Sequence, residues 1–320
     1  PLAIEFYEET INDFLRLFDV KPEVVVSDMH PGYYSTKFGE RHFKDKLLKV
    51  QHHFAHILSC MAENNMPENS EVIGFAFDGT GYGTDKTIWG SEVLIASYKG
   101  FKRVFHLRPY RLPGGDKAVK EPRRTAISLL YETFGDKAMD TGLISIPEKE
   151  QMFFLDMIKK GINSPFTTSM GRLFDGISSI IGLKHTTSYH AQAAIALEQT
   201  ALKSGETGSY PFIVEDDIID YRPLIEKIAG DLKSGVPKET IAKKFHNTIV
   251  EIVIHVSEIL RKETYIKTVA LSGGVFQNSI LLENTFNRLK EDGFIPLIHQ
   301  LVPPNDGGIS LGQVIYGNFL

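Results

Sequence analysis

The pattern of apolar positions predicts helices and strands in alternation near the start of the chain. Residues 4–18 place apolar side chains every three or four positions, which indicates a helix, and the β-branched run at 24–26 is typical of a buried strand. Residues 72–78 predict another strand, and 89–98 and 101–107 predict two more. Three successive strands indicate the beginning of a mixed sheet.

From Glu121 to Lys262 the periodicity becomes mostly helical. The longest of these segments carries an apolar stripe that is typical of a helix packed on a core. The predicted helices cover residues 124–134, 149–162, 172–180, 190–203, 224–233 and 238–261. The chain then returns to α/β order, with a strand at 268–271, a glycine loop at 272–275, a helix at 279–290, a strand at 295–299 and a helix from Gly308.

The two α/β ends share one plan, which is a helix, a strand, a loop and a second helix. We therefore expect a duplicated α/β core, with a first lobe at 1–70 and a second lobe at 71–320. The second lobe would carry a helical insertion at about 110–265, and its last helix would pack back towards the first lobe. The first lobe has no meander, so its missing strands lie upstream of Pro1 in a longer chain, come from a partner, or do not exist.

Two histidines at helical spacing are the first candidates for chemistry. His52 and His56 open an apolar run, and on a helix they lie one above the other on the same face. Their imidazoles could bind one metal ion together, whereas His53 would point about 100° away. Two ligands do not complete a site, so a metal here would need carboxylates from elsewhere in the chain.

Acidic residues beside glycine-rich turns supply those carboxylates. Asp78 ends a predicted strand and is followed by Gly79, Thr80 and Gly81, a turn whose N–H groups can face an anion; a plain tight hairpin explains the stretch equally well. Asp306 precedes the last helix, where it is either an N-cap or a third metal ligand.

Two further stretches have the features of nucleotide-binding loops. Gly273 and Gly274 lie between a strand and a helix, where a backbone free of side chains allows a ligand close approach, and Asn278 follows them. Gly171 precedes Asp175, whose carboxylate could accept hydrogen bonds from a ribose diol; a solvent-facing helix acid is the alternative. Glycine loops expected on two different sheets indicate a nucleotide held in a cleft between lobes.

Composition restricts the class of protein further. The net charge is -5, from 35 basic and 40 acidic residues, which gives no general attraction for nucleic acid. No apolar run is long enough to span a membrane, and no secretory signal is visible, so a cytoplasmic location is expected. The single cysteine, Cys60, excludes a disulfide framework and is expected to be buried. The basic stretch at 117–124 could bind an anion, but a solvated face is the preferred interpretation.

With these motifs in this order, the chain resembles the C-terminal, TsaD-like carbamoyltransferase region of the hydrogenase maturation factor HypF. The resemblance covers essentially the whole chain and implies the two-lobed fold of actin, Hsp70 and the sugar kinases. The matching motifs are 28–33, 50–56, 77–83, 171–175, 272–278 and 304–308. The Cys-rich, acylphosphatase-like and YrdC-like regions of whole HypF proteins are not in this sequence.

The resemblance also implies a site. One divalent metal, iron or zinc, would be held by His52, His56, Asp78 and Asp306. The glycine loops at 79–81 and 273–274, with Gly171 and Asn278, would bind the ATP or AMP part of carbamoyl adenylate, with Asp175 at its ribose. Asp78 would serve both groups.

The implied reaction is carbamoyl transfer to the C-terminal cysteine of a partner, HypE, with no nucleophile from this chain, and with the adenylate made by a YrdC-like domain. Three alternatives remain open on the sequence. They are O-carbamoyl transfer to a small hydroxylated metabolite, threonylcarbamoyl transfer to tRNA, and a nucleotide-dependent scaffold without covalent chemistry.

Overall fold

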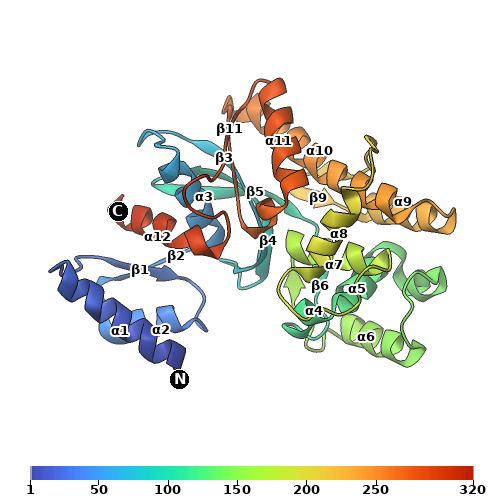
Figure 1. Ribbon diagram of the computed structural model, residues 1–320, viewed down its shortest axis with the longest axis horizontal. Helices are drawn as coiled ribbons and strands as arrows, with labels where there is room; N and C mark the ends of the chain where they lie inside the picture. The colour runs from blue at the N-terminus through green and yellow to red at the C-terminus, as the bar shows by residue number, and fades with distance from the viewer. Residues whose placement is uncertain (1, 320) are drawn as a thin grey trace.

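A nine-stranded mixed sheet forms the centre of the molecule in the computed structural model, which describes residues 2–319 (Figure 1). Its main strand order is β11-β10-β3-β4-β5-β9-β8. The predicted meander is confirmed, because β3, β4 and β5 pair antiparallel, while β10 lies parallel to both β3 and β11. The prediction that the two glycine loops belong to different sheets is wrong, because β3 and β10 are neighbours in this one sheet. The strands are β3 (Val72–Tyr82), β4 (Ile88–Ser97), β5 (Gly100–Leu107), β6 (Tyr110–Arg111), β7 (Phe166–Thr167), β8 (Ile213–Glu215), β9 (Ile218–Asp220), β10 (Thr268–Ser272) and β11 (Ile295–Leu297).

The N-terminal part forms a smaller unit. Strands β1 (Val25–Asp28) and β2 (Leu47–Val50) pair in parallel, and they are accompanied by α1 (Leu2–Leu17) and α2 (Tyr34–His42). The predicted helix at 4–18 is confirmed, whereas no strand was predicted where β2 lies. The parallel pairing sets Asp28 opposite Val50. Asp28 therefore lies close to the helix that begins at His52 and carries the predicted histidine pair.

Side chains of β3 alternate between the two faces of the large sheet. Ile73, Phe75 and Phe77 belong to one buried cluster, whereas Val72 and Ala76 belong to another. This alternation follows from the pleat of a strand, in which successive side chains point to opposite faces. An unbroken apolar run therefore indicates that both faces of this strand are covered, as in a parallel sheet.

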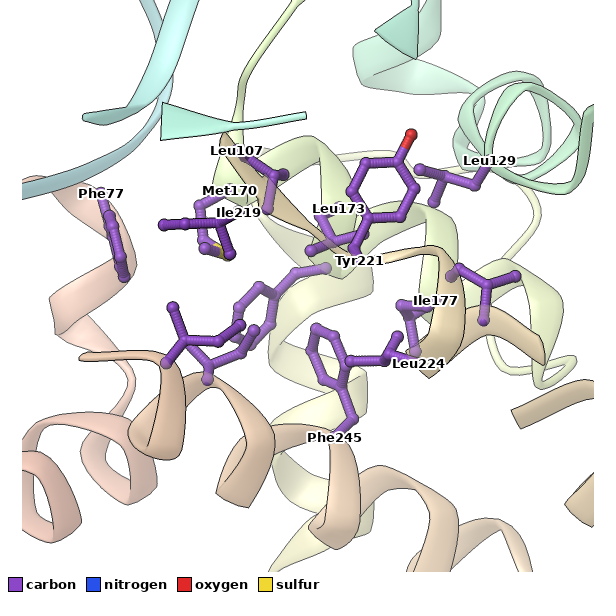
Figure 2. Close-up of a cluster of buried hydrophobic side chains, with 14 of the residues drawn as sticks. Phe77, Leu107, Leu129, Met170, Leu173, Ile177, Ile219, Tyr221, Leu224 and Phe245 are labelled. Carbon is purple, nitrogen blue, oxygen red and sulfur yellow. The ribbon is translucent and has the colours of Figure 1, made fainter. Parts of the chain in front are cut away.

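The larger core lies on the face of Phe77 and is covered mainly by helices from the middle of the chain. Figure 2 shows Phe77, Met170, Leu173, Tyr221 and Phe245 packed together from three elements and a loop. The helices of the middle and C-terminal parts are α4 (Lys117–Lys120), α5 (Pro122–Phe134), α6 (Glu148–Lys160), α7 (Met170–Ile180), α8 (Gln192–Ala201), α9 (Arg222–Lys233), α10 (Lys238–Thr264) and α11 (Ser279–Glu291).

The opposite face is covered by α3 (His52–Glu63), on which α12 (Ile309–Asn318) packs. Glycines allow both contacts to be close. A Cβ on Gly74 would lie 2.7 Å from the Ile57 side chain, and one on Gly312 would lie only 1.9 Å from the Ala55 carbonyl oxygen. Cys60 is a free, buried thiol on α3, as predicted.

The middle of the chain differs from its prediction in one respect. The helices predicted there are confirmed to within a few residues, but β8 and β9 interrupt them as a short hairpin, and β9 joins the large sheet beside β5. Strands of three residues are too short to give a readable alternation. Among residues 2–319, none of the helices combines the length and apolarity needed to span a bilayer.

Candidate metal and nucleotide site

The two histidines lie at the start of α3, as their spacing predicts. Gln51 caps the helix through a hydrogen bond from the Phe54 N–H to its side-chain oxygen, 2.9 Å long. The rings of His52 and His56 are 4.9 Å apart between centroids, and both side chains are almost fully buried. His53 points elsewhere, towards Trp89.

Asp78 reaches the histidines because it continues the alternation of β3. The face of Val72 and Ala76 is the face that α3 covers, and Asp78 is the next even-numbered residue. Its Oδ2 lies 3.3 Å from His52 Nε2 and 4.0 Å from His56 Nε2. Its other oxygen accepts a hydrogen bond from the Gly274 N–H at 3.2 Å.

Asp306 completes the cluster from the turn before α12. Its Oδ1 lies 3.5 Å from Nε2 of both His52 and His56. Asn305, not Asp306, caps this turn, by accepting a hydrogen bond from the Gly307 N–H. The alternative N-cap role for Asp306 is therefore taken by its neighbour, and the Asp306 carboxylate faces the histidines.

The cluster contains groups suited to a divalent cation. One ligand atom from each of His52, His56, Asp78 and Asp306 lies within 4.8 Å of the others. Zinc ligands about 2.0–2.1 Å from a tetrahedral metal stand roughly 3.3 Å apart, close to the separations seen here. His56 Nε2 is buried without a hydrogen-bond partner among the described residues, which a metal bond would remedy. Asp306 is 66% exposed, so the cluster has an open side.

Charge is strongly coupled within this cluster. Burial lowers the pKa of His52, but its hydrogen bonds with Asp28 and the two cluster carboxylates outweigh burial and hold that pKa well above its usual value. Burial raises the pKa of Asp78, yet the neighbouring histidines bring it well below the normal range, and they lower the pKa of Asp306 as well. A proton on His52 thus partly neutralises the negative charge of the carboxylates. A bound metal cation would neutralise the same charge in its place.

A cavity of about 640 Å³ opens directly beside the cluster. It is lined by most of the residues predicted to bind a nucleotide, namely Asp78, Gly79, Thr80, Gly171, Asp175, Gly274 and Asn278. Gly81 and Gly273 do not line it. A Cβ on Gly81 would lie 2.4 Å from the His53 ring, and one on Gly273, at φ +99°, would lie 2.3 Å from the Phe77 carbonyl oxygen. Both glycines therefore allow close packing behind the cavity, and a nucleotide contact of Gly81 or Gly273 stays a prediction.

Asn278 is held in place before any ligand binds. Its side-chain oxygen caps α11 by accepting from the Leu281 N–H, and its amide donates to Nε2 of His246 at 2.9 Å. The Nδ1 of His246 donates to the Ala242 carbonyl oxygen at 2.8 Å. Burial lowers the pKa of His246 to about 4, so its ring is neutral and can accept. His246 therefore orients a residue of the cavity wall.

Two residues near the site were not among the predicted ligands. Asp28 contacts the ring of His52, and Arg172 lines the cavity between Gly171 and Asp175. Arg172 could have been predicted to line the cavity, because it lies in sequence between Gly171 and Asp175, which were both predicted to bind the nucleotide. The predicted solvated basic face is only partly seen, because Lys117 and Lys120 are exposed whereas Arg123 and Arg124 are paired with carboxylates.

Comparison with known proteins identifies the family. Residues 1–63 match the family model described as "HypF Kae1-like domain", and residues 74–313 match "Carbamoyltransferase, Kae1-like Domain, second subdomain". The chain belongs to the HypF carbamoyltransferase family. Carbamoyltransferase HypF of Synechocystis sp. is 39% identical over 97% of this chain, and the HypF homolog of Cupriavidus necator is 32% identical over 98% of it.

Solved HypF structures share this fold. The crystal structure of full-length HypF in a phosphate- and nucleotide-bound form superposes with a TM-score of 0.92 over 99% of this chain, at 39% identity. That of T. kodakarensis HypF gives 0.91 at 31% identity. The chain spans 42% of the Synechocystis relative, 82% of the Cupriavidus homolog and 50% of the first crystal structure. The predicted fold class is confirmed: a mixed α/β fold of the actin, Hsp70 and sugar kinase type.

Proposed function

We propose that this chain transfers a carbamoyl group from carbamoyl adenylate to the thiolate of a C-terminal cysteine on HypE. The observation that carries the proposal is the adjacency of the His52, His56, Asp78 and Asp306 cluster to the glycine-lined cavity, with Asp78 belonging to both. The names of the relatives favour this reaction over O-carbamoyl transfer, tRNA modification or a scaffold role.

In the proposed step, the thiolate sulfur attacks the carbamoyl carbon after losing its proton to solvent. A carbon–sulfur bond forms, the bond from that carbon to the phosphate oxygen breaks, and the electron pair leaves with AMP. Because AMP is already a good leaving group, the chain has to position the reactants and stabilise charge, and it needs no nucleophile of its own.

In the proposal, different residues of the cavity bind different parts of the carbamoyl adenylate. Gly79, Thr80 and Gly274 receive the phosphate, whereas Asp175 and Asn278 hold the nucleoside. The four-residue cluster holds one divalent metal, iron or zinc, which would supply a Lewis acid for the developing negative charge. Its open side at Asp306 leaves room for an oxygen of the substrate.

The partners are the HypE tail and a YrdC-like domain that supplies the adenylate, within a longer cytoplasmic protein. The first relatives are more than twice as long as this chain, which leaves room for such a domain. The division into lobes at residue 70 also stays a prediction.

Mass spectrometry of HypE tests the reaction. Incubation of the chain with carbamoyl adenylate and HypE is expected to add one carbamoyl group to HypE and to release AMP in equal amount. HypE lacking its C-terminal cysteine is the control and should remain unmodified. AMP release without a HypE adduct would contradict HypE as acceptor, and a full adduct with a metal-free His56→Gln chain would contradict the metal's role.

A further inference from the structure

Arg172 is a buried cation in the wall of the cavity. It lies in the first turn of α7, and its side chain is 4% exposed. Among the lining residues in the part of the chain that the structure describes, it is the one lysine or arginine, whereas four lining residues are acidic: Asp78, Asp175, Glu198 and Asp306. A buried cation in a mostly acidic cavity requires an explanation.

Its contact with Asp175 uses only part of the guanidinium. Nη1 lies 2.7 Å from Asp175 Oδ2, which makes an ion pair by distance. The N–H groups are not aligned with that carboxylate, because Nε and Nη1 are buried without a hydrogen-bond partner within residues 2–319. Burial outweighs Arg172 and raises the pKa of Asp175, so the pairing is incomplete from both sides. Unused buried donors are costly, and a ligand that accepts from them would remove that cost.

The backbone brings this guanidinium next to Asp78 and Gly79, where the register of β3 is irregular. A Cβ on Gly171 would lie 2.9 Å from the Gly79 Cα, so the first turn of α7 rests directly on Gly79. Arg172 Nη2 lies 3.5 Å from the position of a Cβ on Gly79. The guanidinium therefore lies between Asp175 and the segment of β3 that carries the metal-ligand candidate Asp78.

The first turn of α7 adds a second attraction for negative charge. Ser169 caps the N–H of Arg172 itself, and the helix continues to Ile180, long enough to have a positive N-terminal end. Both the helix end and the guanidinium face the region of Gly79 and Gly171, which line the cavity without side chains.

We propose that Arg172 binds the phosphate group of the nucleotide in this cavity, with Asp175 holding the guanidinium in orientation. The planar fork of arginine matches phosphate oxygens in two parallel hydrogen bonds, which a lysine cannot do. This inference rests on the proposed function for the nucleotide, but it assigns the phosphate end of that ligand to a residue outside the glycine loops. Arg172 would discriminate a phosphorylated nucleoside from an unphosphorylated one.

Calorimetric titration of the chain with adenosine and with AMP tests the assignment. The measured quantity is the ratio of the two affinities. Arg172→Gln is expected to lower AMP affinity about tenfold or more while leaving adenosine affinity within about twofold, and Arg172→Lys to fall between. Lys120→Gln is the control, because it removes an exposed positive charge one residue from the cavity-lining Val119 and should leave the ratio unchanged.

Loss of the arginine also leaves Asp175 buried without a counter-ion, so a second comparison is needed. Asp175→Asn should weaken both ligands and reduce the ratio only in part, because Arg172 stays in place but loses its orienting partner. The Arg172→Gln, Asp175→Asn double variant should lose the ratio even though no carboxylate is left unpaired. If the double variant recovers the wild-type ratio, Arg172 only neutralises Asp175 and the inference is wrong. If the wild-type chain binds neither ligand, the nucleotide part of the proposed function is wrong and the inference falls with it.

Discussion

The carboxylate of Asp28 lies 2.7 Å from Nδ1 of His52 and thereby orients its ring. Asp28 ends β1, and the β1–β2 pairing sets it beside the start of α3. With Nδ1 engaged, Nε2 of His52 faces Asp78 and Asp306. A carboxylate behind a histidine ligand fixes its tautomer and raises its basicity as a ligand.

Asp28→Asn is therefore expected to weaken metal binding by about 10–100-fold without unfolding the chain, because the ring loses its negatively charged partner. Competition with a chromophoric zinc chelator measures this change. Asp45→Asn, an exposed carboxylate in the same unit, is the matched control and should bind as the wild type does. Equal affinities for Asp28→Asn and wild type would refute a metal-orienting role for Asp28.

His56→Gln and His53→Gln are expected to differ, although the residues are close in sequence and both are buried. His56 is in the cluster, so its variant should lose stoichiometric metal. His53 lies against Trp89 and Gln51, so its variant should keep one metal ion per chain. Elemental analysis of the purified chains after dialysis gives the metal content. Loss of metal from both variants alike would argue against this ligand set.

Glu63, His299 and Ser272 form a buried chain of hydrogen bonds that supports the segment before Asp306. His299 lies 2.9 Å from Glu63 and 2.8 Å from Ser272, and Glu63 also accepts from the backbone N–H groups of Gln300 and Leu301. A carboxylate, a histidine and a serine follow one another as in a hydrolase triad. Ser272 is fully buried, however, and these hydrogen bonds connect α3 to β10 and to the loop at residues 299–301.

We expect Glu63→Ala to cost about 3 kcal/mol of unfolding free energy and to weaken metal binding, since it leaves several buried donors unpaired and frees the loop that presents Asp306. Urea unfolding and the zinc competition assay measure the two effects. Glu68→Ala, at an exposed position, controls for loss of a carboxylate. A stability loss with unchanged metal affinity would show that the loop does not depend on this anchor.

Gly312→Ala is expected to destabilise the chain by about 2 kcal/mol or more, because the added Cβ would meet the Ala55 carbonyl oxygen and push α12 away from α3. Gly230→Ala in α9 is the matched comparison: nothing lies within 4 Å of its Cβ, so it should stabilise by up to about 1 kcal/mol. Thermal unfolding of both variants gives the signs. Equal effects from the two substitutions would contradict the close α3–α12 contact.

Stability should fall in mild acid through His246, whose native pKa is about 4. An unfolded histidine has a pKa of about 6.5, so between these values the unfolded state binds more protons and stability decreases as pH falls. The total effect is roughly 3 kcal/mol, most of it present above about pH 6.5 and lost by about pH 4. Urea unfolding at about pH 7.5 and about pH 5 should show a smaller pH effect in His246→Gln than in wild type. An identical pH dependence would mean that His246 is not buried as a neutral ring.

The sequence by itself determined the local elements and the local half of the site. Helical periodicity placed His52 and His56 on one face of α3, and the apolar run at 72–78 predicted the first part of β3, although that strand continues past Asp78 to Tyr82. These inferences succeed because helix spacing and strand alternation are properties of neighbouring residues.

Only the tertiary structure decided which distant residues meet. Asp28 reaches His52 through strand pairing, and Asp306 reaches the same ring because α12 packs on α3. Gly81 and Gly273 have the composition of ligand-binding loops, yet close packing against His53 and Phe77 uses them as spacers. Such contacts depend on register and crossing geometry between elements far apart in the chain, which no local pattern of side chains encodes.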